Sequence, residues 1–168
     1  MHHSAVLASL LYLPILVMVF LMAMQVGADF DASGARRFVD GYQQAAPETK
    51  LAALLLAASA AIHVALIPVH VDEDPTRAVL FAVCAGAMAS LAVAAFVTPW
   101  WRPAAVVVLV GTIAAYFFYV ATGREEIDPI GISTKLIELS ALALAVIRLS
   151  PVFVQKLTFE RLEKGGRR

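Results

Sequence analysis

Three ionisable side chains lie inside long apolar stretches and could form a chemical site. His63 and His70 share one stretch, and Glu138 lies in a later one. On a helix, seven residues are about two turns, so the two imidazoles would lie on nearly the same face, roughly 10 Å apart. Ionisable groups in membrane segments are expensive and often mark functional sites. Imidazole and carboxylate together suit zinc, iron or copper. They equally suit a proton relay or a quinone headgroup.

A purely structural explanation of the same residues stays open. His63 could hydrogen-bond a neighbouring helix, and His70 could lie among lipid headgroups. Glu138 could pair with Lys135, because residues three apart on a helix are neighbours. Two histidines two turns apart on one helix cannot both ligate one haem iron, so a haem would need a further histidine.

Further candidate residues fall in the same half of the predicted membrane region. They are Cys84, Tyr116 and Tyr119. Cys84 is the sole cysteine, which excludes a disulfide framework and favours a packing role over a nucleophilic one. At the N-terminus, the free amine, two backbone nitrogens and the imidazole of His3, beside His2, form a nitrogen set that suits Cu(II) or Ni(II). The two adjacent histidines could also be incidental.

The composition places these residues in a membrane. Hydrophobic side chains make up 61% of the 168 residues and charged ones 15%, against roughly 45–50% and about 25% in soluble domains. The 13 basic and 13 acidic residues cancel, so no net field attracts nucleic acid. The sequence has no glycine-rich phosphate loop, nucleophile elbow or HExxH motif. We therefore expect an all-α membrane protein without catalytic activity of its own.

Five apolar runs are each near the length of about 20 residues that a membrane-spanning helix needs. They cover residues 5–26, 51–71, 78–98, 104–122 and 136–153. We expect the first run to be retained, because no lysine or arginine precedes it as in a signal peptide. Helix-start residues precede the other four runs: Pro47, Pro75, Pro103 and Pro129, with Asp74 and Asp128 as caps.

The distribution of basic residues predicts the orientation. Arginine and lysine concentrate in the segment 28–50, near residue 102 and in the tail 154–168, whereas the loops on the other side are acidic. The N-terminus is therefore expected outside and the basic tail in the cytoplasm. Residues 1–168 form one membrane domain, with an interfacial helix in the segment 28–50 and a four-helix bundle over residues 51–153.

Small residues predict where the helices meet, because helices in lipid associate by close packing. The run 78–98 carries Ala82, Gly86 and Ser90 four residues apart, and the next run carries Gly111 and Ala115. The first run is bulkier, so it could pack against a neighbouring subunit or face lipid.

Residues 61–147 resemble small uncharacterised multi-pass membrane proteins of high-GC bacteria. The resemblance lies in Ile62-His63, in Pro68-Val69-His70 followed by Asp72-Glu73, and in an acidic loop before the helix with Glu138. It implies the same architecture, in the inner membrane of a bacterium, and brings no known activity.

Three functions remain as hypotheses. The first is a small non-catalytic subunit of a larger membrane complex, respiratory or metalloenzyme-like, with lipids and other integral subunits as partners and no nucleic acid. The second is a protein that binds a metal ion or cofactor through His63, His70 and Glu138. The third is a small oligomeric transporter or channel.

Overall fold

The computed structural model describes residues 33–72 and 74–147, and within them the chain is helical without strands. The helices are α2 (Ser33–Gln44), α3 (Pro47–His70), α4 (Pro75–Val97), α5 (Trp101–Ala121) and α6 (Pro129–Ile147). The predictions for the first span, for His2 and His3, for the end of the last span and for the basic tail lie outside the described residues.

Helices α3 to α6 are each long and apolar enough to cross a membrane. They have 19 to 24 residues, and their mean hydropathy is 1.8 to 2.3. Three of them match the predicted runs 51–71, 78–98 and 104–122 within a few residues, whereas α6 overlaps only the first part of the predicted run 136–153. The predicted membrane-embedded helical bundle is therefore confirmed for the described part of the chain.

Proline marks the start of three of these helices. Helices α3, α4 and α6 begin at Pro47, Pro75 and Pro129, so each starts before the apolar run that predicted it. Helix α5 instead begins at Trp101, and the predicted start at Pro103 is wrong by two residues. Proline is tolerated there because the first four backbone N–H groups of a helix have no partner within it.

Aspartate caps two of the helices, as predicted. The carboxylate of Asp74 accepts a hydrogen bond from the backbone N–H of Arg77, 3.1 Å away, at the start of α4. Asp128 accepts one from the N–H of Gly131 at the start of α6. These caps fix the two loops at one end of the bundle.

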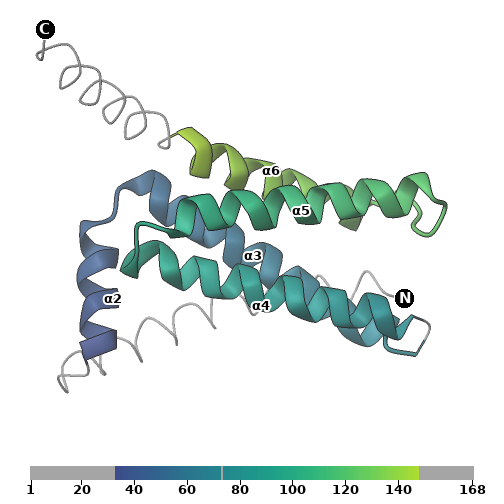
Figure 1. The fold of residues 1–168 in the computed structure, drawn as a ribbon, viewed down its shortest axis with the longest axis horizontal. Coiled ribbons are helices and arrows are strands. Elements are labelled where there is room, and N and C mark those ends of the chain that lie inside the picture. Colours follow the sequence, from purple (N-terminus) through teal and green to yellow (C-terminus); the bar gives the residue numbers. More distant parts are fainter. Residues whose placement is uncertain (1–32, 73, 148–168) are drawn as a thin grey trace, which may run out of the picture.

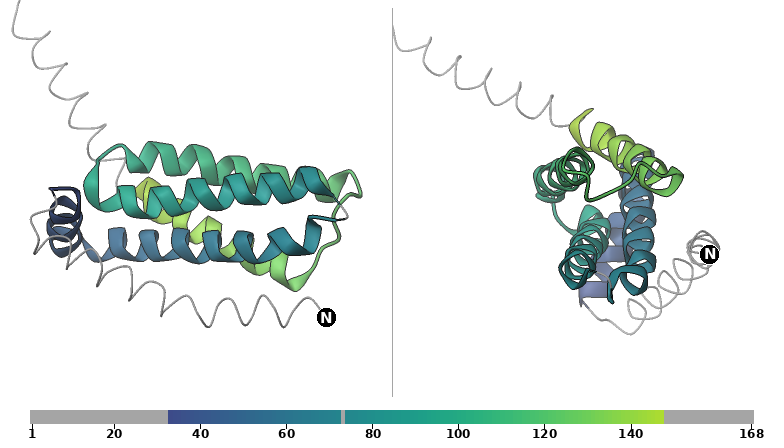
Figure 2. Two further views of the ribbon diagram at one scale, coloured as in Figure 1. Left: turned by 90° about the horizontal axis from the view of Figure 1, so that it is seen from below. Right: turned by 90° about the vertical axis from the view of Figure 1, so that its right-hand side faces the viewer.

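The four long helices run up and down beside one another, and α2 lies across one end of them (Figure 1; Figure 2). The end with α2 is called the α2 end. The opposite end carries the α3–α4 turn and the α5–α6 loop. We call it the acidic end, after Asp72, Asp74, Glu125, Glu126 and Asp128.

The apolar core fills the half of the bundle nearer α2. Its most deeply buried large side chains are Leu56, Met88 and Leu109, with Ala141 and Ala145 completing the contact to α6. Small side chains let α6 approach closely, as packing in lipid requires. The half nearer the acidic end is left for polar side chains.

Helix α2 confirms the prediction of a helix within the segment 28–50. Aromatic contacts hold it against α4. The rings of Phe38 and Tyr42 each lie 5.3 Å from that of Phe96 at the end of α4. Gly41 rests on the Phe96 backbone, where an added Cβ would collide with the carbonyl oxygen. Only glycine permits this approach.

The small residues singled out in the sequence do not hold the described helices together. Ala82, Gly86 and Ser90 are exposed on α4, and Gly111 and Ala115 are exposed on α5. An added Cβ at either glycine would meet nothing within 4 Å. Helix α4 packs through another face instead, formed by Ala78, Ala85, Met88, Leu91 and Ala95. Spacing alone predicts which residues share a face, and it does not identify the face that is buried.

Candidate functional site: a cavity at the acidic end

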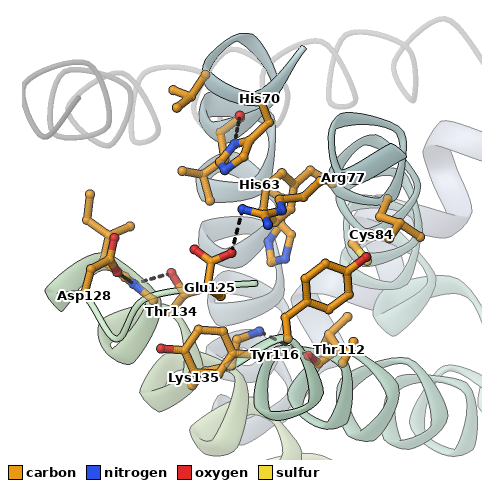
Figure 3. A pocket seen from close by; sticks show the side chains of 18 residues that line it. His63, His70, Arg77, Cys84, Thr112, Tyr116, Glu125, Asp128, Thr134 and Lys135 are labelled. Atoms are coloured by element: carbon orange, nitrogen blue, oxygen red, sulfur yellow. Dashed lines mark hydrogen bonds and ion pairs between the residues drawn. The ribbon is translucent and has the colours of Figure 1, made fainter. Parts of the chain in front are cut away.

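A cavity of about 300 Å³ lies between the four long helices, near the acidic end (Figure 3). All four helices and the α5–α6 loop contribute to its lining. Most of the wall is apolar or aromatic, including Leu66, Leu80, Phe81 and Ile130. Apolar walls with a few placed polar groups are typical of small-molecule sites.

Glu138 lies behind the cavity and is completely buried. Its carboxylate accepts hydrogen bonds from the hydroxyl groups of Ser59 on α3 and Thr112 on α5, both 3.0 Å away. The Lys135 ammonium group lies 2.6 Å from the same carboxylate. The predicted pairing of Glu138 with Lys135 is confirmed, and the carboxylate joins three helices.

Lys135 is the charged residue of this group that reaches the cavity wall. Its side chain is nearly buried, and its Nζ also donates to the Thr112 carbonyl oxygen at 3.5 Å. The same Nζ lies 5.5 Å from the centre of the Tyr116 ring. The positive and negative charges compensate each other, so the cavity carries no uncompensated charge from this pair.

His63 lines the cavity beside this ion pair. Its Nδ1 lies 2.8 Å from the backbone carbonyl oxygen of Ser59, and since a carbonyl can only accept, Nδ1 carries the proton. Its Nε2 lies 3.8 Å from the nearest Glu138 oxygen, which is beyond hydrogen-bond distance. The predicted bond from His63 to a neighbouring helix is therefore replaced by one within α3, and Nε2 stays available.

His70 does not join His63 and Glu138. Its Nδ1 donates to the Leu66 carbonyl oxygen, 3.0 Å away, and its ring contacts Phe81 at 5.0 Å. The His63 ring meets the same Phe81 at 5.7 Å. Within residues 33–72 and 74–147, no group of three or more His, Cys, Asp or Glu could hold a metal ion. The three residues therefore do not converge as expected: His63 lies 3.8 Å from Glu138, and His70 shares with His63 the cavity wall and the Phe81 ring.

The other candidate residues, which were predicted to lie in the same half of the membrane region as the histidines, do line the cavity. Cys84, Tyr116 and Tyr119 contribute to its wall together with both histidines. The Tyr116 hydroxyl group is buried and has no hydrogen-bond partner among the described residues. Gly131 lies against this ring, where an added Cβ would be 2.9 Å from the hydroxyl oxygen. A buried polar atom without a partner is rare enough to require an explanation.

Arg77 ties the loops together at the acidic end of the cavity. Its guanidinium group forms an ion pair with Glu125 at 2.9 Å, visible in Figure 3, and lies 3.6 Å from Asp74. It also donates to the carbonyl oxygen of Arg124 at 2.6 Å. These contacts join the start of α4 to the α5–α6 loop.

Several residues of the site were not predicted from the sequence. Ser59 lies one turn before His63, which was a usable signal for a partner on the same face. Thr112, Arg77 and Glu125 offered none, because their roles depend on how separate helices and loops meet.

Comparison with protein-family models, curated proteins and solved structures gives no match to this chain.

Proposed function

We propose that this protein binds a small neutral amphipathic molecule in the cavity at the acidic end of its membrane bundle. The observation that carries the proposal is the combination of an apolar wall with polar atoms that keep unused hydrogen-bonding capacity. This is the cofactor-binding alternative raised by the sequence, with an organic molecule in place of the metal ion.

The charges around the cavity favour a neutral ligand. Lys135 in the wall is neutralised by Glu138 behind it, and Arg77 is paired with Glu125, so a charged ligand would meet no unpaired counter-charge there. At the mouth, Arg77 compensates Glu125, and Asp128 adds a negative charge that disfavours an anion. An uncharged molecule with one or two polar atoms loses least on entering such a site.

The proposal includes a location. The excess of basic residues near the α2 end favours that end as cytoplasmic. The acidic end then faces outward from a bacterial inner membrane, with the C-terminus inside. Under this arrangement the cavity opens in the outer leaflet.

A second candidate function is that of a non-catalytic subunit in a larger membrane complex. The observation that favours it is the exposed row of small residues, Ala82, Gly86 and Ser90, on α4. Such a row lets another helix approach closely. Purification in mild detergent with a stoichiometric larger membrane protein supports this function, whereas a monodisperse chain without companions contradicts it.

Cys84 provides the test of the ligand-binding proposal, because it is the sole cysteine and lies in the cavity wall. The full chain is placed in liposomes, and N-ethylmaleimide alkylation of Cys84 is followed by mass spectrometry. A small ring compound such as durene or duroquinone is expected to slow the alkylation.

The control for this assay moves the thiol to an exposed site on the same helix, as in Cys84→Ala combined with Ala89→Cys. Its alkylation is expected to be insensitive to both compounds, since Ala89 does not line the cavity. Equal protection of both thiols, or of neither, contradicts the proposal.

A further inference from the structure

We infer that the ligand is a quinone or quinol headgroup that enters the cavity sideways from the membrane, between α4 and α5. This inference rests on the proposed function, because it names the ligand class and the path for the same cavity. It concerns binding alone.

Two unused polar atoms define the chemistry of the ligand. His63 Nε2 lies at the cavity wall and makes no hydrogen bond, since Glu138 is 3.8 Å away. The Tyr116 hydroxyl group is buried and without a partner among the described residues. Imidazole nitrogen accepts from a quinol hydroxyl, and a tyrosine hydroxyl donates to a quinone carbonyl. A quinol satisfies both atoms, because its hydroxyl groups donate and accept, whereas a quinone satisfies the tyrosine hydroxyl alone.

The walls favour a flat ring between these atoms. Phe81 lies in the wall from α4, and Tyr116 and Tyr119 lie there from α5. Aromatic side chains contact a flat ring through offset or edge-to-face arrangements, which add to the burial of apolar surface. Lys135 Nζ, which makes two of its three possible bonds, offers one more donor to a carbonyl oxygen.

The entry path follows from two residues that belong to both the cavity and the exposed surface. Leu80 on α4 is 43% exposed, Ala115 on α5 is also exposed, and both line the cavity. The two helices diverge from their shared turn toward the acidic end (Figure 1). At that end Arg77 and Glu125 join the loops. Among the described residues the open side of the cavity therefore lies between α4 and α5, and in the proposed arrangement it faces lipid, where membrane quinones reside.

The first test compares three compounds with the same methylated ring: durene, duroquinone and durohydroquinone. Protection of Cys84 gives the affinity of each. The oxygenated rings are expected to bind at least tenfold more tightly than durene, because each hydrogen bond contributes a few-fold or more. Equal binding of all three overturns the inference, because the cavity would then take small neutral rings without selection by its unused polar atoms. Protection by none overturns both the inference and the proposed function.

The second test removes one oxygen atom from the site. Tyr116→Phe is expected to weaken duroquinone binding about fivefold, with durene unaffected. The matched control is Tyr42→Phe at the α2 end, outside the cavity, which is expected to bind both compounds as the original chain does. An equal loss for durene and duroquinone in Tyr116→Phe indicates a packing role and overturns the assignment.

The third test blocks the side entrance. Ala115→Phe is expected to slow duroquinone association at least tenfold, whereas Ala114→Phe, one residue away and outside the cavity wall, leaves the rate within twofold. Unchanged association in Ala115→Phe, together with faster association in Glu125→Gln, places the entrance at the acidic end and overturns the lateral path.

Discussion

The buried ion pair makes the sharpest prediction for stability. Lys135→Met removes the ammonium group and leaves the Glu138 carboxylate fully buried, with the hydroxyl groups of Ser59 and Thr112 as its remaining donors. Removing one partner of a buried ion pair typically costs about 3–5 kcal/mol, because the remaining charge has lost its compensation. We expect Lys135→Met to lower the free energy of unfolding by about 3 kcal/mol or more.

A double substitution separates the charge effect from packing. Lys135→Met combined with Glu138→Gln leaves a neutral amide, whose oxygen atom accepts from one of the two hydroxyl groups while its NH2 group donates to the other. Replacing a buried pair by neutral groups of similar volume is often nearly neutral. The double variant is therefore expected to lie within about 1–2 kcal/mol of the original chain, and to be more stable than Lys135→Met alone.

The assay is unfolding in detergent micelles, followed by the loss of helical circular dichroism. Lys50→Met is the matched control, because Lys50 lies near the α2 end, where its ammonium group contacts the Tyr42 ring at 4.8 Å. That contact contributes about 1 kcal/mol or less. Lys135→Met could lower the free energy of unfolding by no more than Lys50→Met does, or the double variant could be the least stable of the three. Either result would show that the compensated ion pair does not hold α3, α5 and α6 together.

Three further predictions concern close contacts and the mouth of the cavity. Gly41→Ala is expected to lower the thermal midpoint of unfolding, because the added Cβ would collide with a carbonyl oxygen on α4. Gly34→Ala is the control and should leave the midpoint unchanged, because the space around Gly34 is open. Equal midpoints for the two variants would count against the contact. Arg77→Gln and Glu125→Gln are each expected to quicken alkylation of the sole cysteine by a water-soluble maleimide. The double variant should react little faster than either single variant, because both substitutions break the same ion pair. Fully additive effects on the alkylation rate would be inconsistent with that pair. Gly131→Ala is expected to shift the neighbouring tyrosine ring and weaken duroquinone binding severalfold, measured by the same protection assay, and unchanged affinity would show that the ring tolerates the methyl group.

Much of the fold could be predicted from the sequence because the membrane imposes simple rules. Apolar length located four helices, and Pro47, Pro75 and Pro129 located three of their starts. The failures have a common physical cause. The face of α4 that packs, with Met88 at its centre, is not the face with Gly86, because the choice depends on the neighbouring helices.

The sequence predicted which residues belong to the site better than it predicted how they are arranged. Residues in the correct half of their helices, such as Cys84 and Tyr116, did come together around one cavity. The separation of His70 from Glu138 was not predictable, because periodicity fixes the face of a histidine on its own helix and does not show that both imidazole rings pack against Phe81 of α4. The cavity lies where α4 and α5 diverge toward the acidic end (Figure 1). The local sequence pattern of either helix does not predict how far apart the two helices lie.

The central claim is that a ligand bonds His63 Nε2 inside the cavity. The most direct measurement is solid-state NMR of the full chain in lipid bilayers, with ¹⁵N-labelled histidine and assignment through His63→Gln. Addition of durohydroquinone is predicted to move the Nε2 resonance of His63 and to leave its Nδ1 bonded to the backbone. An Nε2 resonance that does not move when Cys84 is fully protected would contradict the account.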